Sequence, residues 1–312
     1  MISSSNNIAC QSHPRIALLT PLRDEEDYIE AMIVSIANQQ IRPAKWLIVD
    51  DGSTDETPAI VKAYCQQFDF IELLELPARS ERNPGGEGAI AHALQRLDLS
   101  QYDYLARFDA DLLFEEDYFD RILAEFNRDS RLGVAGGGLY IDQNKTLVLE
   151  RVPEYHVRGA VKMYRRECFE QLCGLGTDIG WDTIDEVYAW SRGWRTRSFF
   201  DIRVIHRRPT GESLHASRIY RERGRAEYLT WSHPVFVLLK SVKIAMGSFA
   251  NARNFLGGFC DSYKMRHLRL ADPEFRRARR TQQLARALNL VTPQWLRTSF
   301  FKRVASPDED RY

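Results

Sequence analysis

The segment YLARFDAD, residues 104–111, runs from an apolar strand candidate into two carboxylates. Tyr104–Phe108 has the apolar character of a buried strand, and Asp109 and Asp111 follow it one residue apart. Two carboxylates in this position can approach one hard divalent cation together, because Mg²⁺ and Mn²⁺ prefer oxygen ligands. A solvated turn or a helix cap is the alternative interpretation of the pair.

A second acidic pair follows another strand candidate. Asp50 and Asp51 come directly after Trp46–Val49. A carboxylate beyond a strand end can accept hydrogen bonds from a ribose hydroxyl or a base N–H. An ordinary strand–turn–helix connection is the alternative, and Ser53 and Glu56 have the spacing of a helix capping box.

Strand and helix patterns alternate on both sides of these pairs. Arg15–Leu19 and Ile71–Leu76 are further strand candidates, and apolar residues at helical spacing mark Asp27–Gln39, Ala89–Leu97 and the residues around Phe119–Phe126. The alternation predicts an α/β fold with a mainly parallel sheet flanked by helices. Ligands of such sheets bind beyond the carboxyl ends of the strands, where both acidic pairs lie.

The charge of the chain is divided unevenly. The formal net charge is +0, which gives no overall attraction to nucleic acid. Residues 240–303, however, carry 14 Lys and Arg against 3 Asp and Glu, whereas residues 1–239 carry 28 against 37. We expect a disordered tail over 1–13, an α/β domain over 14–210 and a helical basic extension over 211–312.

The basic extension also contains aromatic residues. They are Tyr228, Trp231, Phe236, Phe249, Phe255 and Phe259. Aromatic and basic side chains together are typical of a membrane interface and favour peripheral association with an anionic membrane. A helical subdomain packed on the body, or a homodimer interface, is the alternative.

Other features of the sequence indicate where the protein acts. The longest strongly apolar run, Val235–Leu239, is far shorter than the about 20 residues that a membrane-spanning helix needs. Residues 1–14 are polar and predict no secretory signal. The five cysteines have scattered spacings, which favours reduced thiols. We therefore expect a cytoplasmic protein, peripheral on the inner face of the cell membrane.

Four segments, in order, resemble the family 2 glycosyltransferases, which have the GT-A fold. They are Thr20–Glu26, with Asp24 where the family commonly has Asn; Leu47–Asp55; Asn83–Ala91, which lacks the family's usual basic residue; and Phe108–Asp111. The resemblance covers about residues 14–210. It implies a GT-A-like domain and a transferase that uses a nucleotide-sugar donor and Mn²⁺ or Mg²⁺.

The resemblance also implies roles for individual residues. Those that would bind the nucleotide are Pro21, Arg23, Glu25, Asp50, Asp51 and Asp109. Asp50 or Asp51 would contact the ribose or the base, expected to be uracil. Asp109 would face the ribose or reach the metal through water, and Asp111 would hold the metal directly. His206, at a strand end, would complete the metal site; a surface histidine in a basic turn is the alternative.

A later match concerns the catalytic base. The segment Gly180–Glu186 precedes Gly193-Trp194-Arg195, which is similar to a turn of the family. Counting back from Gly193 places Asp182 on the family's base position, with Trp181 in place of Glu. Asp185, three residues later on the same helix face, is the alternative base. Helix capping is the structural alternative for both.

The activity that the resemblance implies is inverting transfer of a sugar to a hydroxyl. The acceptor would be a glycan or a lipid-linked glycan in polysaccharide or lipopolysaccharide biosynthesis. Two other functions remain open. One is a transferase that loads sugar onto polyprenyl phosphate, which needs no deprotonating base. The other is a non-catalytic partner subunit that keeps the GT-A fold.

Overall fold

The computed structural model describes residues 14–77, 87–143, 146–172, 181–208, 216–266 and 272–291. The chain divides into two compact units. The first comprises residues 1–173 and 196–207, and the second comprises residues 174–195 and 208–312. The first unit therefore ends close to the boundary expected near 210, but residues 174–195 belong to the second unit. The expected tail, 1–13, lies outside the described residues.

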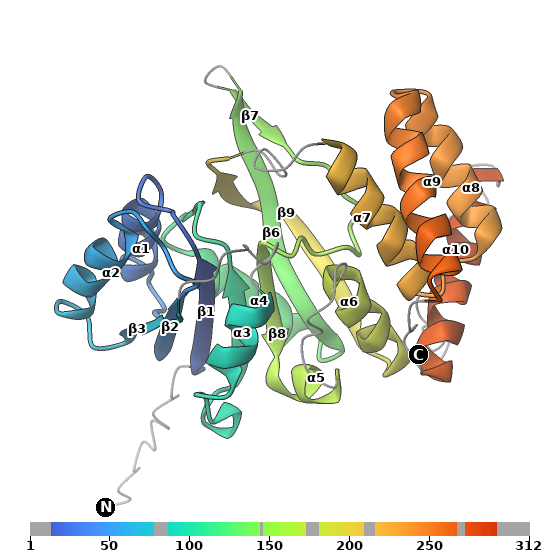
Figure 1. Ribbon diagram of the computed structural model, residues 1–312. Coiled ribbons are helices and arrows are strands. Elements are labelled where there is room, and N and C mark those ends of the chain that lie inside the picture. The colour runs from blue at the N-terminus through green and yellow to red at the C-terminus, as the bar shows by residue number, and fades with distance from the viewer. Residues whose placement is uncertain are drawn as a thin grey trace, which may run out of the picture. The chain divides into compact units, whose positions relative to one another are not determined.

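A sheet of nine strands forms the centre of the first unit in the described residues (Figure 1). The strand order is β3-β2-β1-β4-β8-β6-β9-β5, and β7 pairs with β6. The ladders β1–β2, β1–β4 and β2–β3 are parallel, whereas β4–β8, β6–β8, β6–β7 and β5–β9 are antiparallel. The predicted sheet flanked by helices is confirmed, and the sheet is mixed. The strands are β1 Ile16–Leu22, β2 Lys45–Asp50, β3 Ile71–Glu75, β4 Tyr104–Phe108, β5 Leu112–Phe114, β6 Leu132–Gln143, β7 Thr146–Leu149, β8 Val161–Arg165 and β9 Arg195–His206.

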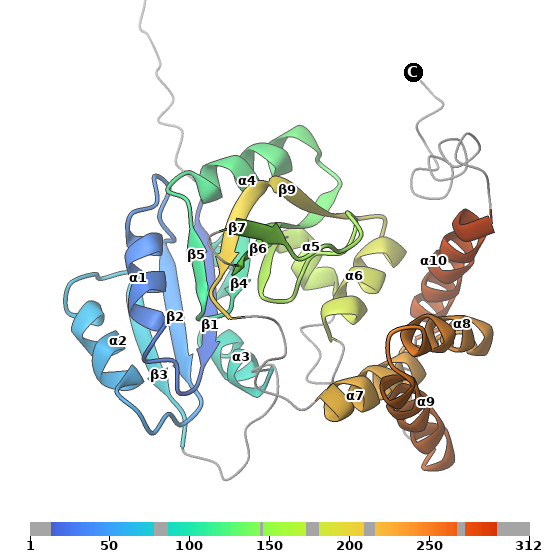
Figure 2. The same cartoon turned by 90° about the horizontal axis from the view of Figure 1, so that it is seen from above.

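The helices of the first unit cover both faces of its parallel strands. They are α1 Ile29–Ala37, α2 Thr57–Cys65, α3 Glu87–Leu94, α4 Tyr118–Arg128 and α5 Arg166–Gln171, with a short 3₁₀ helix, η1, at Leu99–Gln101. Helices α1 and α2 lie on one face and α3 on the other (Figure 2). This follows from right-handed crossovers, because β4 lies on the opposite side of β1 from β2 and β3. The carboxyl ends of β1, β2 and β4 therefore meet at one edge.

Apolar packing fixes the segment that follows β4. The ring of Phe108 lies 4.7 Å from that of Phe114, and Phe114 lies 4.8 Å from Tyr118. All three side chains are buried. Because Phe108 and Phe114 stand on either side of residues 109–111, their burial holds both ends of the acidic segment in place.

Two local predictions need correction. Ser53 does not cap α2: its hydroxyl donates to Asp50 Oδ1 over 2.5 Å and accepts from Asp24 N over 2.9 Å. Helix α2 instead begins at Thr57, and Glu56 at its N-cap makes no side-chain cap hydrogen bond. Helix α3 begins at Glu87 rather than Ala89. Residues 83–86 of the glycine-rich turn lie outside the described residues.

Helices make up most of the described residues of the second unit. Helix α6 packs on α10 through Ile184, Val187 and Phe275, which are buried, and the rings of Tyr188 and Phe275 lie 4.9 Å apart. None of the described helices is both long enough and apolar enough to cross a bilayer. The helices are α6 Trp181–Ser191, α7 Ala216–Leu229, α8 Pro234–Ala245, α9 Phe249–Lys264 and α10 Pro273–Val291.

Helices α7 and α9 approach each other at two glycines. A Cβ atom added to Gly224 would lie 1.9 Å from the carbonyl oxygen of Phe255, and one added to Gly258 would lie 1.9 Å from that of Arg221. Neither oxygen is part of a flexible side chain, so the helices would have to separate. Gly257, next in the chain, differs: its nearest neighbour would be the Arg221 guanidinium at 3.8 Å.

We predict that Gly258→Ala lowers the free energy of unfolding of the second unit by at least about 1–3 kcal/mol, because the added methyl group overpacks the contact with the backbone of Arg221. Gly257→Ala is the matched control. It should leave stability unchanged or raise it by up to about 1 kcal/mol, because alanine favours the helix and has room there. Urea unfolding followed by far-ultraviolet circular dichroism measures both. Equal effects of the two substitutions would contradict the close approach of α7 and α9.

A buried carboxylate joins three helices of the second unit. Glu227 of α7, 5% exposed, accepts hydrogen bonds from Lys240 of α8 and from Arg279 of α10, the latter over 3.2 Å. Ser232 donates to the same carboxylate and accepts from Gln283 over 2.8 Å. Burial alone would raise the pKa of Glu227, but the charges of Lys240 and Arg279 outweigh burial and lower the pKa to about 2.

Glu227→Gln should reduce the free energy of unfolding by about 3 kcal/mol at pH 7, because Arg279 loses its buried counter-charge. The folded-state pKa lies below the ordinary value of 4.5, so this stabilisation is fully present above pH 4.5 and is lost as the pH falls toward 2. The difference between wild type and Glu227→Gln should thus be about 2 kcal/mol smaller at pH 3. Urea titrations of both proteins at the two pH values test this; a gap that does not change with pH would refute it.

Candidate metal and nucleotide site

The pairing of β5 with β9 brings Asp111 and His206 together. Leu112, the residue after Asp111, lies opposite His206 in the antiparallel ladder, and Arg207 N donates to Asp111 O over 2.9 Å. His206 Nε2 is 3.5 Å from Asp111 Oδ1. The two residues are only 5% and 6% exposed. The structure thus places together the two residues that the sequence nominates as metal ligands.

Glu150 lies on the other side of the His206 ring. Its Oε1 is 3.6 Å from His206 Nδ1, and its Oε2 accepts from Arg158 Nη2 over 2.5 Å. Glu150 itself follows β7 and donates its backbone N–H to Leu139 O over 2.8 Å. A carboxylate facing Nδ1 favours the tautomer that carries the proton there, which leaves Nε2 directed at Asp111.

The two carboxylates control the charge of His206. Burial alone would lower the pKa of His206, but interactions with Asp111 and Glu150 outweigh it and raise the pKa to about 9. Without a cation, a protonated imidazole therefore balances the buried negative charge on both sides of the ring at neutral pH; a metal ion bound at Nε2 would displace the proton there.

The Asp111–His206 pair fits part of a metal site. Two ligand atoms at right angles and about 2.1 Å from a cation lie about 3 Å apart, close to the 3.5 Å between Oδ1 and Nε2. Within the described ranges, no group of three or more His, Cys, Asp or Glu side chains could hold a metal ion. Glu150 does not add a third ligand because it faces the opposite ring nitrogen. A cation here would take its remaining ligands from substrate phosphates and water, as Mg²⁺ often does.

Two loops at the neighbouring strand ends are joined by hydrogen bonds. Asp24 Oδ1 accepts from Thr54 N over 2.8 Å, and Glu25 N donates to Thr57 Oγ1 over 2.8 Å. Asp24 has φ +54°, a conformation in which Asn and Asp are enriched, and Gly52 has φ +80°. These backbone conformations fold the loops after β1 and β2 against each other.

Asp50 and Asp51 have different environments within these loops. Asp50 Oδ1 accepts from both the backbone N–H and the hydroxyl of Ser53, so its carboxylate holds the turn. Asp51 is 6% exposed and is tied by its backbone to Leu22 O over 2.9 Å. Its carboxylate makes no hydrogen bond with another side chain or backbone group in the part of the chain described. Of the two, Asp51 has the carboxylate that remains available to a ligand.

The other predicted nucleotide-binding residues lie at the same edge. Pro21, the penultimate residue of β1, lies opposite Val49, and Glu25 is buried in the loop that follows. Arg23 Nε is 3.7 Å from Asp24 Oδ2. Asp109 is more exposed than Asp111, with a side chain 40% accessible and Oδ1 3.5 Å from Arg107 Nη2.

Asp182 and Asp185, the two candidate bases, belong to the second unit. Helix α6 begins at Trp181, so Asp182 lies in its first turn; the side chain of Asp182 is outside the described residues. Asp185 is 4% exposed, and its Oδ1 accepts from Glu186 N over 2.7 Å. The role of either residue stays a prediction.

Two residues of the site were not found from the sequence. Glu150 comes between a short strand and a loop, with no motif around it, and only the fold brings it to His206. Arg107 lies inside the apolar run of β4, where it is 3% exposed and donates from Nη1 to Gly159 O over 2.6 Å. A charged residue within a buried strand was the one available signal for Arg107.

Comparison with known proteins establishes the family. The sequence profile described as "Glycosyl transferase family 2" matches residues 18–175, just over half of the chain. The chain belongs to glycosyl transferase family 2. The match covers the acidic segments after β2 and β4 and the loop that contains Glu150. His206 lies outside the region of this family 2 protein that the profile matches.

Relatives and a solved structure agree with this. An uncharacterized glycosyltransferase (MG025 homolog) of Mycoplasma pneumoniae is 32% identical over 139 residues, 40% of this chain and 44% of the relative. Poly-beta-1,6-N-acetyl-D-glucosamine synthase of Staphylococcus aureus is 26% identical over 203 residues, 58% of this chain and 47% of the relative. This chain thus spans about half the length of these curated relatives. The fold resembles that of mannosyltransferase PcManGT from Pyrobaculum calidifontis, solved with GDP-Man and Mn²⁺, at TM-score 0.54 and 17% identity over 95% of this chain and 87% of that one.

Asp111→Asn should weaken Mn²⁺ binding more than about 100-fold, because an amide is a poorer ligand for hard cations and this side chain is directed at Nε2 of His206. Asp109→Asn, the matched control, should cost about 10-fold or less because Asp109 is exposed and pairs with Arg107. Electron paramagnetic resonance of free Mn²⁺ in the presence of UDP measures both affinities. Equal losses in the two variants, or full donor turnover in excess EDTA, would overturn the assignment of Asp111.

Proposed function

We propose that this family 2 protein is an inverting glycosyltransferase. It moves a sugar from a nucleoside-diphosphate donor to a hydroxyl of a glycan or lipid-linked glycan, in polysaccharide or lipopolysaccharide biosynthesis. The observation that carries the proposal is the 3.5 Å approach of His206 to Asp111 at the carboxyl edge of the parallel strands. Ligands of α/β sheets bind at this edge, and the residue pair suits a cation shared with a diphosphate.

The donor would lie across the ends of β2, β1 and β4. Asp51 would accept a hydrogen bond from the base, expected to be uracil, or from the ribose, while Asp50 keeps the turn in shape. Pro21, Arg23 and Glu25 would line the nucleotide pocket from β1. Adjacent strands are about 4.8 Å apart, so β2 and β4 stand about 10 Å apart with β1 between them. This separation suits a nucleoside bound at one end and its diphosphate at the other.

Asp111 and His206 would hold the divalent cation, with Asp109 facing the ribose or a metal-bound water. When bound, the cation supplies charge neutralisation for the departing diphosphate. An imidazole nitrogen suits transition metals better than Mg²⁺, which favours Mn²⁺. Glu150 would orient His206, and Arg158 would in turn hold Glu150 through their 2.5 Å hydrogen bond.

The direct test is release of nucleoside diphosphate from UDP- and GDP-linked sugars with Mn²⁺ and no acceptor. Slow release that requires Mn²⁺ and is lost in Asp111→Asn supports the proposal. A protein that binds a nucleotide sugar and never releases nucleoside diphosphate, with or without glycan acceptors, would instead be a non-catalytic partner subunit.

Asp182 would remove the proton from the acceptor hydroxyl as the oxygen attacks the anomeric carbon. Asp185 remains the alternative, although its carboxylate already accepts from Glu186 N. That hydrogen bond and its burial suit a structural role, which supports Asp182 as the base.

Asp182→Asn should reduce sugar transfer by about 10²–10⁴-fold while leaving the dissociation constant of the donor nearly unchanged, as expected for loss of a general base. Asp185→Asn is its control in the same helix. Transfer assays and donor titrations on both variants separate chemistry from binding. Near-normal transfer by Asp182→Asn together with an inactive Asp185→Asn would identify Asp185, one helical turn later, as the base. Normal transfer to polyprenyl phosphate by both would favour the alternative transferase.

Helix α8 offers a surface for peripheral membrane association. Val235, Leu238, Leu239, Val242 and Met246 follow helical spacing and are 51–86% exposed. The aromatic residues that the sequence suggested for this role are divided: Phe249 is exposed, whereas Tyr228 and Phe255 are buried. We infer that the α8 stripe, with the exposed Lys243 beside it, enters the interface of an anionic bilayer.

Val242→Asp should abolish co-sedimentation with anionic vesicles, because it places a carboxylate in the apolar stripe. Val34→Asp introduces the same change at an exposed position of α1 and should have no effect. Wild-type binding should weaken at high salt because each basic residue near the surface contributes about 1 kcal/mol of screened attraction. Equal recovery with neutral and anionic vesicles, or none with either, would exclude an electrostatic tether; α8 would then be better placed in a homodimer interface.

A further inference from the structure

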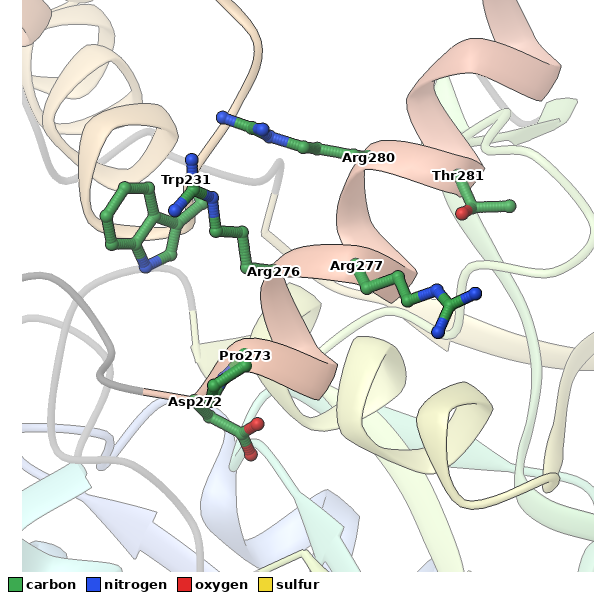
Figure 3. Close-up of a pocket in the computed structure, with 7 residues that line it drawn as sticks. All are labelled: Trp231, Asp272, Pro273, Arg276, Arg277, Arg280 and Thr281. Carbon is green, nitrogen blue, oxygen red and sulfur yellow. The ribbon is translucent and has the colours of Figure 1, made fainter.

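The second unit contains a pocket that the proposed transfer does not use. It has a volume of about 470 Å³ and lies between Trp231, in the turn before α8, and the first turns of α10 (Figure 3). Pockets for small molecules typically have volumes of about 300–1,000 Å³. The pocket is thus large enough for an organic group rather than a single ion.

The pocket is strongly basic. Arg276, Arg277 and Arg280 of α10 line it, and none forms an ion pair within the described part of the chain. Arg279 of the same helix differs, since it pairs with the buried Glu227 at 3.2 Å. The exposed guanidinium groups of Arg276 and Arg280, on adjacent turns, repel each other unless an anion lies between them.

The single acidic residue of the lining is already occupied. Asp272 Oδ1 accepts from Glu274 N over 2.8 Å and from Phe275 N over 3.1 Å, which caps α10. Its carboxylate reduces the positive charge of the pocket but does not reach a guanidinium in an ion pair within the described residues. The lining therefore keeps a net positive charge.

Trp231 fixes one of the arginines. The guanidinium carbon of Arg276 lies 4.4 Å from the centre of the Trp231 ring, within the range of a cation–π contact. Trp231 is held in turn by its backbone, which has φ +58° and donates to Tyr228 O over 3.2 Å. Arg276 and Arg280 extend from α10 on the Trp231 side, whereas Arg277 points the other way (Figure 3). Arg276 and Arg280 are four residues apart, one above the other on the helix.

We propose that this pocket binds a phosphate ester, with Arg276 and Arg280 on the phosphate oxygens and the Trp231 side of the pocket on the attached organic group. Two guanidinium forks offer ten N–H donors, more than the two oxygens of a carboxylate accept but suited to a phosphate or diphosphate. The ester comes either from the headgroup of an anionic lipid or from a phosphorylated sugar; the chemistry recognised is the same. The proposal does not depend on the transfer reaction.

The first experiment measures binding of inorganic pyrophosphate in EDTA by calorimetry. Wild type should bind it, and Arg276→Gln/Arg280→Gln should lose roughly tenfold or more in affinity, because both charge-assisted contacts are removed. Arg253→Gln/Lys264→Gln removes two exposed charges from α9 and is the matched control. All four substituted positions are exposed, so both double variants should keep the fold of the wild type. Circular dichroism checks this. No binding by wild type, or equal losses in the two double variants, would overturn the proposal.

Three further measurements locate the site and its ligand. Asp111→Asn should keep pyrophosphate binding in EDTA, and Arg276→Gln/Arg280→Gln should keep Mn²⁺-dependent donor binding, so failure of this proposal is distinguishable from failure of the proposed transfer. Pyrophosphate should change tryptophan fluorescence in wild type and not in Trp231→Phe; an identical change in both would place the anion elsewhere. Titration with dioctanoyl phosphatidate and with glucose 1-phosphate then separates the sources, since tighter binding of one identifies a lipid or a sugar phosphate.

Discussion

The candidate site depends on one short antiparallel ladder, the pairing of β5 with the last residues of β9. Leu112 lies opposite His206 and Phe114 opposite Val204, which brings together residues almost a hundred positions apart in the chain. Leu112 and Val204 are buried, so a slip of one residue would expose them and turn His206 to the other face of the sheet. Apolar packing on β5 therefore sets the position of the imidazole. The same packing keeps Asp111 beside it, because Asp111 is the residue immediately before the ladder.

The sequence predicted the parallel part of the sheet well and the antiparallel part poorly. Strands β1 to β4 are short apolar runs, each separated by a helical pattern, so local periodicity is enough to place their carboxyl ends. Strand β6 is twelve residues long and contains Gly136-Gly137-Gly138, which has low β propensity and appeared as a loosening of the pattern. A Cβ atom on Gly137 would lie 2.5 Å from Ile202 O. Glycine is therefore required at this position because the backbone of β9, distant in the sequence, passes close to it. Such a requirement cannot be inferred from periodicity alone.

The same difference explains which site residues were foreseen. Asp109 and Asp111 follow a recognisable strand, and His206 ends another, so a motif and a strand end were sufficient to nominate them. The sequence around Asp50 and Asp51 does not distinguish the two residues. Their hydrogen bonds do, because Asp50 Oδ1 accepts from the backbone N–H and the hydroxyl of Ser53 over 2.9 and 2.5 Å. Glu150 faces Nδ1 of His206, and its position depends on β7 pairing with β6. A residue that is recognised only by its contact with another side chain cannot be identified until the fold is known.

Charge in the second unit follows a physical rule that separates structural from binding arginines. Arg279 is buried, and a buried guanidinium is tolerated only with a counter-charge, which Glu227 supplies. Arg276 and Arg280 are exposed and receive no such partner among the described residues, although Asp272 lies in the same pocket. Asp272 is committed to the backbone of α10, so it stabilises the helix without neutralising the arginines. Of these three arginines, Arg279 fastens α10 to α7, while Arg276 and Arg280 line a pocket where water is the alternative partner. The cation–π contact with Trp231 accounts for the position of Arg276, but an exposed cation contributes little to folding, so the fold gives no such reason for Arg280 beside it. A ligand with several anionic oxygens does.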